Sequence, residues 1–127
     1  MIDPKELRLG NLVKTNKGIL IQANGIRHDW EAMDYIIIDK NDIGYSIDEL
    51  SPIHITPEWL ERLGLNDHSF EFSKVFTVSY YDGIVHIEQY HEGPKDMPHI
   101  IYIHQLQNLY HALTGQELTV KELTPTL

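Results

Sequence analysis

Short apolar runs rich in β-branched residues alternate with polar turns through the first half of the chain, a pattern typical of strands. The runs are Leu9–Lys14, Gly18–Ala23, Asp34–Ile38 and Ile43–Ile47. Asn16-Lys17-Gly18 and Asn24-Gly25 stand between them and suit tight hairpin turns. This order of strands and turns is similar to that of an SH3-like small barrel, which is an analogy of fold alone.

A short helix is predicted after these strands. Thr56 is a good N-cap, Pro57 suits the first helical position, and Glu58 favours the positive end of the helix dipole. Gly64 supplies a left-handed stop. The pattern therefore predicts a helix of about two turns between Thr56 and Gly64.

The dipeptide Asp82-Gly83 predicts a two-residue hairpin turn, and this turn fixes a strand register. With Tyr81 opposite Ile84, one face is apolar and the other is polar, as a half-buried sheet requires. The apolar face holds the pairs Tyr80–Val85, Val78–Ile87 and Phe76–Gln89. The polar face holds the pairs Ser79–His86 and Thr77–Glu88.

The last third of the chain predicts a loop over Glu92–Pro98, a strand over Ile100–Ile103 and a helix over His104–Thr114 that ends at Gly115. A stripe at i, i+3, i+4 and i+7 consists of Leu106, Leu109, Tyr110 and Leu113. We expect this stripe to pack on the apolar face of the hairpin. A strand or extended tail is expected over Glu117–Val120.

These elements predict one α+β domain over residues 1–127. A strand-rich sub-region, residues 1–55, is followed by the short helix, the hairpin, the strand and the C-terminal helix of residues 56–127. No internal repeat or low-complexity linker divides the sequence.

Composition narrows the classes of function. The net charge is −9, although residues 1–17 carry four basic side chains against two acidic ones, and an acidic chain repels phosphate backbones. The absence of cysteine excludes disulfides, thiolate zinc sites and cysteine nucleophiles. No apolar run is long enough for a membrane span, and no signal segment is recognised, so we expect a cytoplasmic protein without a membrane partner.

Three segments resemble a family of short uncharacterised proteins from bacterial genomes and prophages. They are Leu7–Val13, Pro52–Leu65 and Tyr102–Val120, about a third of the chain. The last is the most specific, with a His-Gln-Leu-Gln-Asn-Leu core and a Leu-Thr-Gly-Gln-Glu-Leu ending. The resemblance implies an accessory role in a mobile element, and it carries over no catalytic or binding residue.

Eight histidines raise the question of a metal site. His104 and His111 are seven residues apart on the predicted helix, about 10 Å along its axis, so they cannot share an ion. His86 and Glu88 point the same way but form only two ligands. A loop set has no fixed spacing and consists of His91, Glu92, Asp96 and His99. We predict no metal site and no cofactor, and no catalytic motif is recognised, so no enzyme is expected.

The best candidate for binding is a contact patch on the polar hairpin face, beside Thr77 and Ser79. Its proposed members are Tyr81, His86, Glu88 and Tyr90. Trp30, in the polar stretch Arg27–Ala32, is the other unusual residue. A tryptophan there can anchor a partner, but we expect it to fold back onto the core.

The leading hypothesis is a non-enzymatic binding or accessory protein of a phage or mobile element, with a protein partner. The first alternative is a nucleic-acid-associated SH3-like module, which would use a basic edge made of Lys5, Arg8, Lys14 and Lys17. The second alternative is a small metal-dependent enzyme, which would need several of His86, Glu88, His91 and His99 in one pocket.

The leucine stripe yields a first prediction. Leu106→Asp is expected to abolish cooperative thermal unfolding, because an unpaired buried carboxylate costs on the order of 5 kcal/mol, comparable to the stability of a small domain. Circular dichroism against temperature measures the effect. Asn108→Asp, off the stripe, is the control, and a folded Leu106→Asp variant would show that the core is misplaced.

Overall fold

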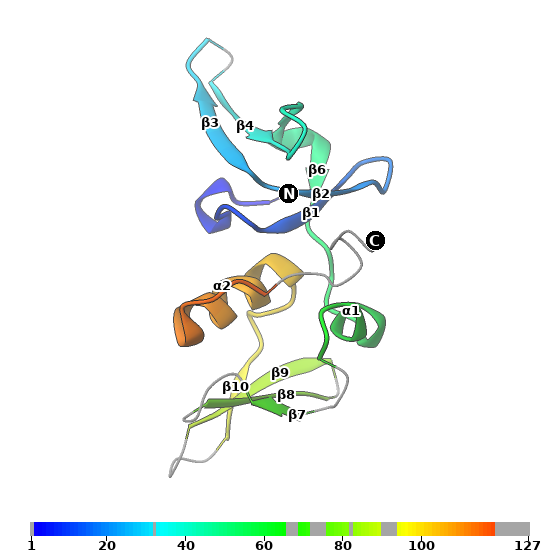
Figure 1. Ribbon diagram of the computed structural model, residues 1–127, viewed down its shortest axis with the longest axis vertical. Coiled ribbons are helices and arrows are strands. Elements are labelled where there is room, and N and C mark those ends of the chain that lie inside the picture. The colour runs from blue at the N-terminus through cyan, green and yellow to red at the C-terminus, as the bar shows by residue number, and fades with distance from the viewer. Residues whose placement is uncertain are drawn as a thin grey trace, which may run out of the picture. The chain divides into compact units, whose positions relative to one another are not determined.

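The computed structural model describes residues 2–31, 33–65, 69–71, 76–81, 83–89 and 94–118. Within these residues, the strands form three antiparallel sheets, accompanied by two α-helices, so the chain is a mixed α+β protein as predicted (Figure 1). The chain divides into two compact units, residues 1–53 and 54–127. That boundary lies two residues from the predicted division between the sub-regions.

Two small sheets build the first unit. The first has the strand order β2-β1-β6, and the second has the order β3-β4-β5. Their strands are β1 Leu12–Thr15, β2 Leu20–Gln22, β3 Gly25–Asp29, β4 Asp34–Ile38, β5 Gly44–Ser46 and β6 Leu50–Ser51. Two 3₁₀ turns, η1 Pro4–Glu6 and η2 Ile47–Glu49, complete the unit.

Apolar side chains from both sheets and from the 3₁₀ turn η2 meet in one core. Its buried members are Ile2, Leu7, Val13, Ile21, Ala23, Ile37, Ile47 and Leu50. Ile26, Tyr35 and Tyr45 pack against this cluster from its partly buried edge. Burial of each large aliphatic side chain contributes about 1.5–3 kcal/mol, so this cluster is the main attraction that holds two short sheets together.

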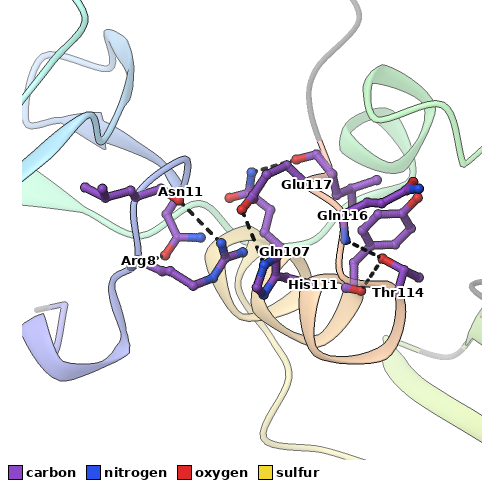
Figure 2. Close-up of polar contacts among 10 residues, drawn as sticks. Arg8, Asn11, Gln107, His111, Thr114, Gln116 and Glu117 are labelled. Atoms are coloured by element: carbon purple, nitrogen blue, oxygen red, sulfur yellow. Dashed lines mark hydrogen bonds and ion pairs between the residues drawn. The ribbon is translucent and has the colours of Figure 1, made fainter.

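The first strand begins three residues later than Leu9–Lys14 predicts. Gly10 takes a left-handed φ of +94°, and the buried Asn11 carboxamide oxygen accepts the Arg8 N–H at 2.6 Å. The Arg8 guanidinium donates to the Leu9 carbonyl at 3.4 Å (Figure 2). These contacts close a turn in which Leu9 stays exposed, so the extended backbone starts only at Leu12.

Strand β3 corrects a second expectation. Asn24-Gly25 was predicted as a hairpin turn and Arg27–Ala32 as a polar stretch, but Gly25–Asp29 is a strand paired with β4. The reason is tertiary: β4 has the bounds predicted for it, and its Ile37 and Tyr35 lie opposite Ile26 and His28.

The first helix of the second unit, α1 Pro57–Arg62, has the predicted caps. The Thr56 hydroxyl accepts the Trp59 N–H at 3.2 Å, and Gly64 takes a φ of +82° just after the helix. Leu60 is buried in the helix, and the Arg62 guanidinium lies 4.0 Å from the centroid of the Trp59 ring.

The sheet of the second unit has the strand order β10-β9-β8-β7. Its strands are β7 Ser69–Glu71, β8 Phe76–Tyr81, β9 Ile84–Gln89 and β10 Pro94–Met97. The predicted register is confirmed from Tyr81–Ile84 through Phe76–Gln89, and Val78 and Val85 are buried on the apolar face. Strand β10 lies where a loop was expected. Pro94 is compatible with a strand here because it is the first residue of an edge strand, where a missing N–H is tolerated.

The strand predicted over Ile100–Ile103 is wrong. Only Tyr102 pairs, in an isolated bridge with His54, and the Ile55 N–H donates to the Ile101 carbonyl at 3.0 Å. Helix α2 Ile103–Thr114 begins at once, because the Gln105 carboxamide oxygen accepts the N–H groups of Ile101 and Tyr102 at 2.9 and 3.0 Å. The Tyr80 hydroxyl donates to the Ile55 carbonyl at 3.3 Å, which links β8 to this bridge.

Helix α2 ends at Gly115 as predicted, but its buried side lies further toward its N-terminus than the predicted stripe. The buried residues are Ile103, His104, Leu106 and Gln107, while Leu109, Tyr110 and Leu113 are half-buried. That the stripe covers the hairpin stays a prediction.

Residues 116–118 return along α2 after Gly115. The Gln107 side chain is 0% exposed, and its amide donates to the Leu118 carbonyl at 2.8 Å. Figure 2 shows the neighbouring contacts, in which the Thr114 hydroxyl donates to the Tyr110 carbonyl and accepts the Gln116 N–H. Glu117 and Leu118 form no strand, and the rest of the predicted tail lies outside the described residues.

The cap of α1 yields a prediction. Thr56→Ala is expected to lower the free energy of unfolding by about 1 kcal/mol, because the Trp59 N–H loses its acceptor. Urea denaturation measures the change. Thr56→Ser keeps the hydroxyl and is the control, and equal losses in both variants would argue against a capping role.

Candidate interaction surface

The contact patch predicted on β8 and β9 is only partly described. His86 is 8% exposed, and its Nδ1 lies 2.5 Å from the Asp96 carboxylate, directly across the β9–β10 pair. Glu88 is exposed on β9. Tyr81 lies in β8 opposite Ile84, but its side chain, like the whole of Tyr90, falls outside the described residues. Strand β10 thus turns the predicted contact histidine into a buried partner of a carboxylate.

The histidines proposed as metal ligands do not converge in the described part of the chain. No three His, Asp or Glu side chains there are close enough to hold an ion. His104 is buried near the start of α2, and His111, further along it, lies 4.0 Å from the Glu117 carboxylate. His99 is exposed, Asp96 contacts His86, and His91 and Glu92 lie outside the described residues.

The proposed basic edge is spread along the first unit. Lys5 lies in η1, before β1, and Lys17 lies in the turn that follows β1, and Figure 1 shows these two turns at opposite ends of that strand. Lys14 is exposed on β1, and Arg8 is half-buried. Lys5 and Lys17 therefore lie on turns before and after β1, with Lys14 on the strand between them.

The end of the β3–β4 hairpin carries the two most exposed large apolar side chains of the described residues. Trp30 is 76% exposed and Met33 is 73% exposed. The expectation that Trp30 folds back onto the core is wrong. We call residues Asp29, Trp30, Glu31, Met33 and Asp34 the hairpin tip.

The geometry of the hairpin explains how these side chains reach solvent. In the β3–β4 register, Ile26 faces Ile37 and His28 faces Tyr35 on one side of the ribbon. Ile37 is 0% exposed in the core, so this row starts in the core and continues outward through the His28–Tyr35 pair. Strand β5 pairs only with Ile36–Ile38, and the hairpin extends beyond it (Figure 1).

Tilted and edge-on ring contacts connect Trp30 to the core. The Trp30 ring centroid lies 4.3 Å from that of His28, and the His28 ring meets the Tyr35 ring edge-on at 4.9 Å. Tyr35 in turn packs against the buried cluster. Aromatic pairs at these separations contribute roughly 0.5–1.5 kcal/mol each. The ring contacts therefore hold the indole on its core side, while most of its surface stays exposed to solvent.

Three carboxylates belong to the hairpin tip, and two of them lie on the ribbon face opposite the His28–Tyr35 pair. Asp29 and Asp34 are directly opposed at the end of the ladder, and Glu31 is exposed in the connection between them. The Asp29 carboxylate accepts the Glu31 N–H at 3.0 Å, and the Asp34 carboxylate accepts the Tyr35 N–H and the Ser46 hydroxyl. The hairpin tip therefore combines two exposed apolar side chains with three hydrogen-bonding or exposed carboxylates.

The backbone at Met33 adds a cost to this arrangement. Its φ is +52°, in the left-handed region that favours glycine or asparagine. A long side chain is therefore displayed at a position where a turn residue without one would fit more easily.

Asp39 fixes the other end of β4. Its carboxylate accepts the N–H groups of Asn41 and Ile43 at 2.8 and 3.0 Å, and the Tyr45 hydroxyl at 3.2 Å. Burial by itself raises the pKa of Asp39, but the bonds from Ile43, Asn41 and Tyr45, with the nearby Lys40 charge, bring it below its ordinary value of 3.8. Burial and then the Asp39 charge raise the pKa of Tyr45 above 10.0.

Comparison of the chain with known protein families, curated proteins and solved structures gives no match. In the described part of the chain, no helix is both long enough and apolar enough to cross a membrane.

The Asp39 contacts yield a prediction about pH. A carboxyl whose folded pKa is lowered stabilises the fold above its ordinary pKa of 3.8, and that stabilisation is lost as the pH falls through the folded value. Asp39→Asn is therefore expected to lower the free energy of unfolding at pH 7, with a difference from the wild type that narrows below about pH 4.

Urea denaturation between pH 7 and pH 3 measures this difference. Asp48→Asn, which removes an exposed carboxylate on η2, is the control for the change of charge. A difference for Asp39→Asn that stays constant over this range would contradict the proposed role of the carboxylate.

Proposed function

We propose that this chain is a non-enzymatic protein-binding module that contacts its partner through the hairpin tip. The proposal rests on one observation: Trp30 is exposed, and its ring is connected to the core through the rings of His28 and Tyr35. A single exposed aliphatic side chain is ordinary on a protein surface, but an exposed tryptophan and an exposed methionine in the connection of one hairpin are not. Tryptophan is also among the residues that dominate binding energy at protein interfaces.

The support beneath the tip favours binding over mere exposure. A contact residue that is already ordered loses less conformational entropy when a partner arrives, and the His28 and Tyr35 rings restrict the indole in advance. The accessory role that the resemblance to prophage proteins implies is compatible with a binding module. We therefore propose an accessory role for this module in a phage or mobile element.

A photo-crosslinking experiment tests the proposal. Benzoylphenylalanine replaces Met33, and the protein is irradiated in a lysate of its source organism. We expect one discrete crosslinked protein, which disappears when Trp30→Ala is added and which binds the unmodified chain again after purification. Trp30→Ala removes the ring contact with His28 and is expected to lower the free energy of unfolding by no more than about 1.5 kcal/mol, so the variant should stay folded.

The matched control places benzoylphenylalanine at Ile19, which is 57% exposed in the connection between β1 and β2. The same products from both positions, products that contain only a second copy of this chain, or no product at all would overturn the proposed function.

A further inference from the structure

Strand β3 leaves one of its edges open beside the Trp30 ring. It stands at the end of the sheet order β3-β4-β5, so within the described residues only β4 pairs with it. We infer that an extended segment of the partner protein binds along this edge as an antiparallel strand, with apolar side chains on the Trp30 face and an acidic side chain opposite Arg27. This inference rests on the proposed function and deepens it, because it names the form of the partner and the contacts that select it.

Backbone hydrogen bonds near the end of β4 show which way its residues face. The Asp39 N–H donates to the Ile43 carbonyl at 2.9 Å, on the side of β5, and the Asn24 N–H donates to the Ile38 carbonyl at 2.8 Å, on the side of β3. Neighbouring residues of an antiparallel strand direct their backbone groups to opposite edges. Ile38 thus faces β3, and so does Ile36, two residues before it.

The register carries this alternation across to β3. Arg27 lies opposite Ile36, so its backbone groups bond to β4, and those of its neighbours Ile26 and His28 point away from β4. Within the described part of the chain, no hydrogen bond engages these outward-pointing groups. The edge therefore offers the N–H and the carbonyl of Ile26 and of His28 to a further strand.

Strand β3 also lacks the features that keep edge strands from pairing. Proteins protect such edges by shortness, by lysine or by proline. Edge strand β10 begins with Pro94 and continues with Lys95, and the edge strands β2, β5, β6 and β7 have no more than three residues in the described part of the chain. Strand β3 has five residues and contains neither lysine nor proline. Among the described edges, the one that leads to Trp30 is thus the best suited to receive a strand.

The side chains of β3 define the two faces that an added strand meets. His28 lies on the face of the Trp30 ring, with the two ring centroids 4.3 Å apart. Arg27 lies on the other face, where it is exposed and, among the described residues, has no ion pair. An apolar side chain opposite His28 would cover part of the exposed indole, and a carboxylate opposite Arg27 would supply a counter-charge.

The positive charge of Arg27 argues against a second copy of this chain as the occupant. Two β3 edges paired about Arg27 would place like charges directly opposite each other, which destabilises a strand pair. Two chains that each carry a net charge of −9 also repel each other over a longer range. A strand of another protein with a carboxylate at this position avoids the local repulsion.

A synthetic peptide with the sequence Val-Thr-Val-Glu-Val-Thr-Val is the probe, and its binding to the full chain is measured by NMR. When its glutamate lies opposite Arg27, the two valines beside the glutamate lie opposite Ile26 and His28. We expect the bound peptide to slow hydrogen exchange of the Ile26 and His28 amides at least several-fold. Exchange of the Arg27 amide is expected to stay unchanged, because this amide already bonds to β4.

Methyl groups on the peptide backbone separate strand addition from other modes of binding. Methylation of the nitrogens of the two valines beside the glutamate removes the donors that face β3, and it is expected to abolish binding. Methylation of the two threonine nitrogens, which point away from β3, is the matched control and is expected to leave binding intact. Equal effects of the two modifications, or unchanged exchange of the Ile26 and His28 amides with the unmodified peptide, would overturn the inference.

An exchange of charges tests the acidic position. Arg27→Glu is expected to weaken the peptide about two- to five-fold, the range for one cross-strand ion pair, and a peptide with lysine in place of glutamate is expected to recover the loss. Lys17→Glu makes the same change of charge in the exposed turn after β1 and is the control. A loss of the same size in both variants, or no recovery with the lysine peptide, would count against the inference.

The two proposals fail in different ways. The partner that crosslinks at position 33 is added to the full chain, and we expect it to protect the Ile26 and His28 amides from exchange. A partner that depends on Trp30 but leaves these amides unprotected would overturn the strand inference and leave the proposed function intact. Self-association of the chain that is lost in Trp30→Ala, measured by analytical ultracentrifugation, would overturn both.

Discussion

The register of strand β4 is the constraint on which the first unit depends. Ile37 must face the core, because a shift by one residue would place Ile36 or Ile38 there and turn the whole strand over. Asp39 prevents such a shift at one end by closing the turn to β5 through two backbone N–H groups. Tyr35 lies two residues from Ile37 on the same face of the strand. The positions of the Tyr35 ring and of the His28 ring that contacts it therefore follow from the burial of Ile37.

The same constraint explains how a small domain presents a tryptophan to solvent in a defined orientation. A free two-stranded ribbon is only marginally stable in water, and the part of the hairpin beyond β5 has just such a two-stranded form. The rings of His28 and Tyr35 extend the packing of the core along this ribbon and stop short of its end. Packing that starts in the core thus fixes the position of the Trp30 indole, although the indole itself is not buried. A rigid contact residue needs this arrangement.

Local chemistry predicted those elements whose signals are complete within a few residues. Thr56, Pro57 and Gly64 defined α1, and Asp82-Gly83 fixed the register of β8 and β9, because caps and tight turns depend on backbone geometry alone. Strands β3 and β10 were not predicted because distant partners decide them, β4 for β3 and β9 for β10. The strand predicted over Ile100–Ile103 is wrong, since the only pairing there is the bridge from Tyr102 to His54. The site was harder still. Trp30 is unusual in the sequence, but its exposure follows from where β5 ends. The sequence predicts His86 as a contact residue because no local signal indicates strand β10, which buries it.

The left-handed backbone at Met33 has a consequence for how this sequence can change. Left-handed φ angles cost a residue other than glycine roughly 1–2 kcal/mol, so glycine at this position would give a more stable protein. Selection for stability alone would remove the thioether, and a consensus-based stabilisation of the chain would begin with this substitution. A methionine retained here across related sequences would therefore mark a compromise between folding and recognition, and its replacement by glycine would mark a lineage in which the tip has lost its partner.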